Sequence, residues 1–83
     1  MSRDAFVLAL IDIKDRTVNF EIDAPEARQE VGHAMRLYLV GLGCTPSMLD
    51  WAADQVHDRY NDELITVQSG FRVADELERL VRS

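Results

Sequence analysis

The first third of the chain carries two hydrophobic patterns that predict β structure. Apolar residues occupy every second position of the segment 18–23, which is typical of a strand with one buried face. The segment 6–13 is almost continuously apolar, as in a strand covered on both faces, and the charged residues 14–16 would form the turn between the two. The alternative is an amphipathic helix over residues 2–14, because alanine and leucine favour helices. We predict the hairpin, with the helix as its rival.

Apolar residues at helical spacing dominate the next part of the chain. Asp23 precedes this pattern as a candidate N-cap, and Pro25 stands in the first turn. Gly41 and Gly43 supply the usual signal for the C-terminal end of a helix. Thr45 can cap a second helix that follows directly. The short connection predicts that the two helices pack against each other as a pair.

The pattern becomes mixed after Tyr60. Residues 63–68 are rich in β-branched side chains and predict a short third strand, although they could also extend the preceding helix. Ser69-Gly70 would break the chain, and apolar residues at helical spacing predict a final helix after this break, at Val73, Leu77, Leu80 and Val81. The predicted fold class is therefore α+β, with a small N-terminal β-hairpin, and this short strand where it forms, packed with three helices. A mostly α-helical fold is the alternative.

Composition indicates one compact folded domain that spans residues 1–83. Hydrophobic residues make up 47% of the chain and charged residues 29%, the balance of a globular protein rather than a disordered one. The apolar run 5–11 is too short to cross a bilayer and has no signal-peptide cleavage site, so we expect no membrane partner. The single cysteine, Cys44, cannot form an internal disulfide and fits a reducing compartment. We expect a cytoplasmic protein.

The charge balance argues against direct contact with nucleic acid. The formal net charge is −6, with 15 acidic and 9 basic residues, and the basic residues are spread from Arg3 to Arg82. The two helices around Thr45 could form a helix-turn-helix, but the second one carries aspartates where a DNA-reading helix needs basic or base-reading residues. Phosphates would be repelled by such a helix.

The candidate catalytic and metal-binding residues do not form a known motif. Asp54, His57 and Asp58 share a helical flank, but metal sites usually draw ligands from more than one element, and no EF-hand loop or H-E-x-x-H motif is present. Cys44 precedes a helix, yet the spacing brings neither His33 nor His57 to it. Gly41-Leu42-Gly43 is too short for a phosphate loop. We expect no enzyme activity, no cofactor and no metal.

An acidic ridge with one tryptophan is the most informative feature of the chain. Aspartates recur every four residues, so on a helix they form one slowly drifting line, at Asp50, Asp54, Asp58 and Asp62. Trp51 lies among them, about 160° from the middle of the apolar face by helical phase. Internal packing against another element is the alternative use of this indole. We interpret the ridge and Trp51 as a partner-binding surface, because tryptophan is enriched among interface hot spots.

A second candidate surface lies at the end of the first predicted long helix. Leu37, Leu39 and Val40 make its last turns apolar on almost every side. A domain of 83 residues has difficulty covering such a segment by itself. Self-association would cover it, so these three residues predict a homodimer interface.

These observations favour a non-catalytic protein-binding module whose acidic helix docks on the basic surface of a partner protein. In size, acidity and lack of catalytic motifs, the chain resembles the small inhibitors encoded by phages and mobile elements, anti-CRISPR proteins among them. This resemblance covers no specific residues, and it implies inhibition of a host complex that handles nucleic acid. The alternative is a small homodimeric accessory or regulatory subunit of a bacterial complex.

Overall fold

Helices make up the whole of the regular structure in residues 1–60 and 66–82, which are the residues that the computed structural model describes. No strand occurs in these two ranges, so the predicted α+β class is wrong and the described fold is all-α. The elements in chain order are α1 (Arg3–Val18), α2 (Ala24–Gly41), α3 (Pro46–His57), the short 3-10 helix η1 (Asp58–Tyr60) and α4 (Val67–Arg82).

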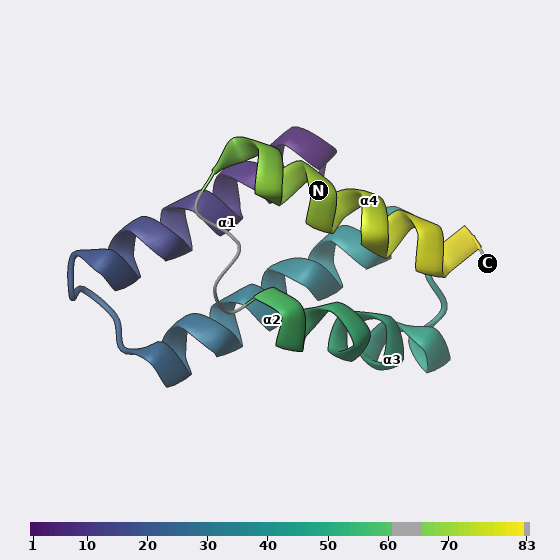
Figure 1. Cartoon of the computed structure of the whole chain (residues 1–83). Coiled ribbons are helices and arrows are strands. Elements are labelled where there is room, and N and C mark those ends of the chain that lie inside the picture. Colours follow the sequence, from purple (N-terminus) through teal and green to yellow (C-terminus); the bar gives the residue numbers. More distant parts are fainter. Residues whose placement is uncertain (61–65, 83) are drawn as a thin grey trace.

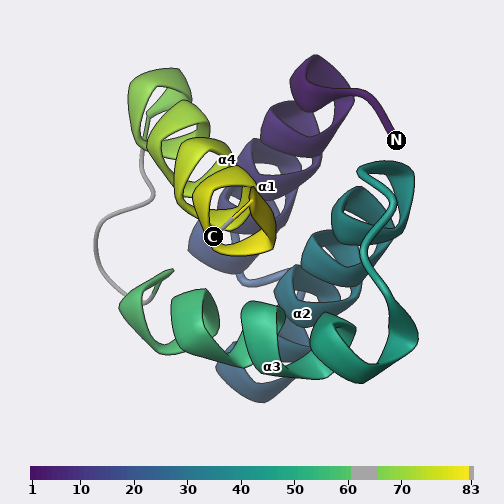
Figure 2. The ribbon, with the colours of Figure 1, turned by 90° about the vertical axis from the view of Figure 1, so that its right-hand side faces the viewer.

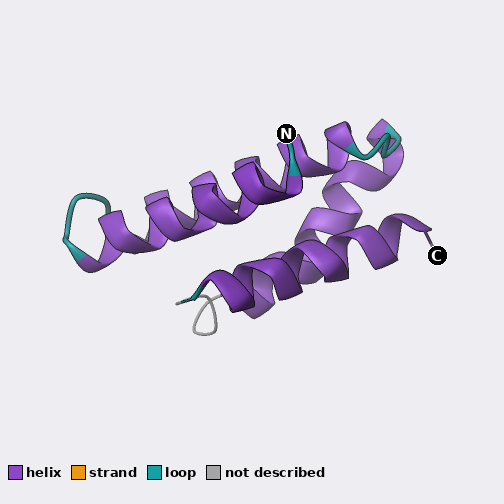
Figure 3. Ribbon diagram, turned by 90° about the horizontal axis from the view of Figure 1, so that it is seen from above, coloured by secondary structure: helices purple, strands orange, loops and turns teal. Residues whose placement is uncertain are grey.

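The four α-helices of the described ranges surround one hydrophobic core. α1 packs against both α2 and α4, and α3 packs against α2 and α4, so each helix has two principal neighbours (Figure 1). Viewed end-on, α1 and α4 form one side of the molecule, and α2 and α3 form the other (Figure 2). Seen from above, no strand interrupts the helices and loops that are drawn (Figure 3). Within the described residues, we find no helix with both the length and the apolar character needed to cross a membrane.

The N-terminal segment is a helix because its buried residues follow helical spacing on a broad face. Phe6, Val7, Leu10 and Ile13 are buried, and they lie between α2 and α4. The hydroxyl of Ser2 accepts a hydrogen bond from the backbone of Ala5 (3.1 Å) and caps the first turn. The predicted hairpin is therefore wrong. The long apolar run reflects contact with two neighbouring helices, which widens the apolar face of a helix until it looks like a doubly covered strand.

The alternating pattern of residues 18–23 comes from the end of α1 and not from a strand. Asn19 is the C-cap, and the next two backbone amides fold back onto the helix, from Phe20 to the Thr17 carbonyl (3.2 Å) and from Glu21 to the Arg16 carbonyl (2.8 Å). These two bonds define a Schellman motif. Its left-handed position is held by Phe20, with φ 60° and 94% of the residue exposed. Glycine is the usual residue at this position.

The ends of α2 confirm the predicted signals. The carboxylate of Asp23 accepts a hydrogen bond from the Glu26 amide (2.8 Å) at the start of the helix. A second Schellman motif closes the other end, where Gly43 takes φ +83° and donates to the Val40 carbonyl (3.0 Å). Thr45 is the N-cap residue of α3, as predicted, although its side chain makes no capping bond. α2 and α3 pack as neighbours, which confirms the predicted pair.

α4 begins earlier than the sequence indicated. It starts at Val67, within the segment 63–68 predicted as a strand, while residues 61–65 lie outside the described part of the chain. Thr66 accepts a hydrogen bond from the Ser69 amide on its hydroxyl (3.1 Å), so it provides the start signal. Gly70 does not break the chain: it is buried inside α4, where its missing Cβ allows close approach to Val7 of α1.

Residues from all four α-helices and η1 meet in the core. The rings of Phe6 and Tyr38 stack at its centre with 4.6 Å between centroids. Both residues are almost fully buried, and desolvation raises the pKa of Tyr38. Tyr60 of η1 closes one side of the core, and burial raises its pKa as well. The outward faces of α3 and of the α1–α2 pair are the surfaces that the core leaves for other uses.

Candidate functional site

Trp51 lies on the outward face of α3. The inward face of this helix is fully occupied by Ala52, Ala53 and Val56, which are almost completely buried. Trp51 is 48% exposed, in agreement with its helical phase. Half of a large apolar ring system is thus in contact with solvent on a helix whose core contacts are already complete.

Asp50 and Asp54 flank Trp51 by helical phase, and the structure links both to Arg36 of α2. The Nε of Arg36 donates to Asp50 Oδ1 (2.8 Å), and its Nη2 lies 3.7 Å from Asp54 Oδ1. Gly32 makes room for this arginine, because a Cβ there would lie 2.8 Å from Arg36 Nη1. The ridge therefore contains a cation that the spacing of the aspartates did not reveal.

The two later aspartates of the ridge are placed differently. Asp58 is exposed, but it belongs to η1 rather than to α3, so the straight line of acids ends there. Asp62 falls outside the described residues. The surface that the structure assembles, called here the Trp51 face, consists of Asp50, Trp51, Asp54 and Arg36.

His57 joins α3 to α2 and does not lie among the acids as a metal ligand would. Its Nε2–H donates to the backbone carbonyl of Arg28 (2.8 Å), which holds the ring between the two helices. Across residues 1–60 and 66–82, no three histidine, cysteine, aspartate or glutamate side chains gather closely enough to hold a metal ion.

Cys44 and His33 lie in separate places. Cys44 is half-buried in the loop between α2 and α3, with its Sγ 3.6 Å from the Thr45 carbonyl. His33 is exposed and lines a groove between α1 and α2. The structure gives neither side chain a catalytic partner among the contacts described above.

The three residues predicted for a dimer interface divide between core and surface. Leu39 is fully buried, so it has no surface for a second copy to contact. Leu37 and Val40 are 43% and 58% exposed on the outside of α2. Leu37 also lines the α1–α2 groove, together with Met1 and Ala9, and this groove has a volume of about 340 Å³.

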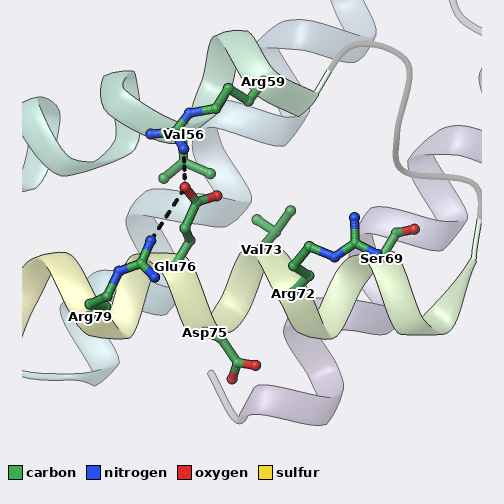
Figure 4. A pocket seen from close by; sticks show the side chains of 8 residues that line it. All are labelled: Val56, Arg59, Ser69, Arg72, Val73, Asp75, Glu76 and Arg79. Carbon is green, nitrogen blue, oxygen red and sulfur yellow. Dashed lines mark hydrogen bonds and ion pairs between the residues drawn. The ribbon is translucent and has the colours of Figure 1, made fainter.

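A larger groove, which we call the arginine groove, lies between α3–η1 and α4 (Figure 4). Its volume is about 560 Å³, and three of the nine basic residues of the chain line it, namely Arg59, Arg72 and Arg79. The sequence analysis missed it because Arg59 comes from a different element. A partial signal was present, since Arg72, Glu76 and Arg79 have the spacing of one stripe along a helix.

The Trp51 face and the arginine groove are the two surfaces that the structure adds to the argument about function. No protein-family model matches the chain, and no curated protein or solved structure matches it significantly.

Proposed function

We propose that the chain is a non-catalytic protein-binding module whose Trp51 face docks on a basic surface of a partner protein. The observation that carries this proposal is the position of Trp51, 48% exposed beside the carboxylates of Asp50 and Asp54. An aromatic ring that enters a partner's pocket is the usual centre of a protein interface, and surrounding polar groups form its rim.

The charges around Trp51 set the chemistry of the partner. The side chains of Asp50 and Asp54 are 75% and 70% exposed, on a chain whose formal net charge is −6. Such a surface attracts a basic partner and accelerates its association. Arg36 neutralises part of this charge and holds the two carboxylates in place. A basic surface of this kind would otherwise hold nucleic acid, so docking would act as inhibition, in the manner of a phage or mobile-element inhibitor.

The proposal is tested by comparing three immobilised baits in an extract of the source cell: the native chain, Trp51→Ala and Leu8→Ala. Leu8 is the matched control because it is an exposed large apolar residue on α1, away from the Trp51 face. The specific partner should be retained by the native chain and by Leu8→Ala, and lost with Trp51→Ala. With that partner purified, Trp51→Ala should weaken binding by more than about tenfold while the melting temperature changes little.

The contribution of the acids is measured in the same assay. Asp50→Asn with Asp54→Asn should slow association and reduce its salt dependence, whereas the dissociation rate should change less. A partner that binds native chain and Trp51→Ala equally well would exclude the Trp51 face as the docking surface. Loss of folding in Trp51→Ala would show that the indole is a structural residue.

A homodimeric accessory subunit is the second candidate, and the exposure of Leu37 and Val40 beside Met1 favours it. Light scattering at high micromolar concentration should then give twice the mass of one chain. Leu37→Ser with Val40→Ser should restore the single-chain mass without loss of helicity, because neither residue belongs to the core. A single-chain mass for the native protein would reject this candidate.

A further inference from the structure

The arginine groove holds more positive than negative charge at one point. Arg59 and Arg79 both contact the same oxygen, Oε1 of Glu76, as the dashed lines of Figure 4 show. The distance from Arg79 Nη2 to this oxygen is 3.6 Å, and Arg59 Nη1 donates to it directly. One carboxylate therefore serves two guanidinium groups, each with five N–H donors.

Neighbouring acids do not cancel this excess. Asp75 points away from Glu76 in Figure 4 and pairs with Arg3 of α1. Glu76 itself is largely buried, with 18% of its side chain exposed, while Arg59 and Arg79 are 59% and 73% exposed. The carboxylate is thus at the bottom of the contact, and the two guanidinium groups reach the solvent above it. An oxyanion could approach both cations from that side.

The rest of the groove suits an apolar body attached to such an anion. Val56 of α3 and Val73 of α4 line it next to Glu76 (Figure 4). Its volume of about 560 Å³ lies within the range of small-molecule sites, which runs from about 300 to 1,000 Å³. Arginine pairs also prefer carboxylate and phosphate groups, because their N–H groups match two oxygens at once.

We propose that the arginine groove binds a small amphiphilic oxyanion, with its carboxylate or phosphate group between Arg59 and Arg79 and its apolar body against Val56 and Val73. This site is independent of the Trp51 face, since the two surfaces have no residue in common. An acidic chain would thereby carry one surface for a basic partner and one groove for an anion.

The experiment is an NMR titration of the native chain with four probes: phenyl phosphate, benzoate, inorganic phosphate and phenol. Saturable shifts should appear for backbone amides of α4 and for the Nε–Hε groups of Arg59 and Arg79. Phenyl phosphate or benzoate should bind at least about fivefold more tightly than inorganic phosphate or phenol, because only these two combine an anion with an apolar body. Their ratio distinguishes a phosphate ligand from a carboxylate ligand.

Three variants decide whether the proposed residues are responsible. Arg79→Gln should weaken the binding of the better probe at least fivefold, whereas Arg82→Gln, which removes the same charge from α4 outside the groove, should change it less than twofold. Glu76→Gln should tighten binding about threefold or more, because it removes the internal competitor for both guanidinium groups. The proposal is overturned by unsaturable shifts up to 20 mM probe, by equal weakening in Arg79→Gln and Arg82→Gln, or by weaker binding in folded Glu76→Gln.

Discussion

Replacing Phe20 with glycine should make the protein more stable. Phe20 takes the left-handed position of the Schellman motif that ends α1, with φ 60°. Gly43 takes the equivalent position at the end of α2, with φ +83°. The same motif is thus built once with the residue that it favours and once with an aromatic residue that it disfavours.

Three terms set the size of the effect. A side chain in the left-handed region costs about 1–2 kcal/mol, and glycine removes this cost. The greater backbone freedom of glycine in the unfolded chain opposes it by about 0.5–1 kcal/mol. The lost burial is small, about 0.2 kcal/mol, because Phe20 is 94% exposed. The net gain is about 0.5 kcal/mol, which corresponds to a rise in melting temperature of about 2–4 °C for a domain of this size.

The assay is thermal unfolding followed by circular dichroism, with Gly43→Ala as the reciprocal control. A Cβ at Gly43 would meet no atom within 4 Å, so this substitution changes only the backbone preference. It should cost about 1 kcal/mol, the opposite sign from Phe20→Gly. A lower melting temperature for Phe20→Gly would refute the reasoning, because it would show that the ring makes contacts worth more than the strain.

Two further predictions concern the core. Gly70→Ala should destabilise the protein by about 1–3 kcal/mol in urea unfolding, although alanine normally favours a helix, because its Cβ would lie 2.8 Å from Cγ1 of Val7; unchanged or increased stability would contradict the close α1–α4 contact. The raised pKa values of Tyr38 and Tyr60 keep both phenols protonated in the folded state at a pH where the unfolded chain has lost these protons. The free energy of unfolding should therefore be constant below about pH 10 and fall above it, and Tyr60→Phe should reduce the slope. A flat profile up to pH 11 would show that the two phenols ionise equally in both states.

The sequence predicted those parts of the fold that depend on neighbouring residues. Asp23 marks the start of α2 and Gly43 its end, and both act through hydrogen bonds within a few residues. The exposure of Trp51 followed from helical phase alone. Each of these features needs only the local geometry of one helix.

The errors arose where a second helix decides the outcome. The apolar run of α1 is wide because α2 and α4 both cover it, and a hairpin prediction has no access to that fact. Gly70 looks like a chain break in the sequence but serves a contact with Val7, far away in the chain. The links from Arg36 to Asp50 and from Arg59 to Glu76 also join different helices. Residue spacing within one helix cannot show such pairs.

The packing of the first helix against the last has a consequence for the order of folding. α1 and α2 are joined by a short turn, so their contacts require little loop closure, and α2 and α3 are joined almost as directly. The α1–α4 contact brings together the two ends of the chain and carries the largest closure entropy. We therefore expect α1, α2 and α3 to associate first and α4 to dock last. Substitutions at Gly70 should then accelerate unfolding and leave the folding rate nearly unchanged.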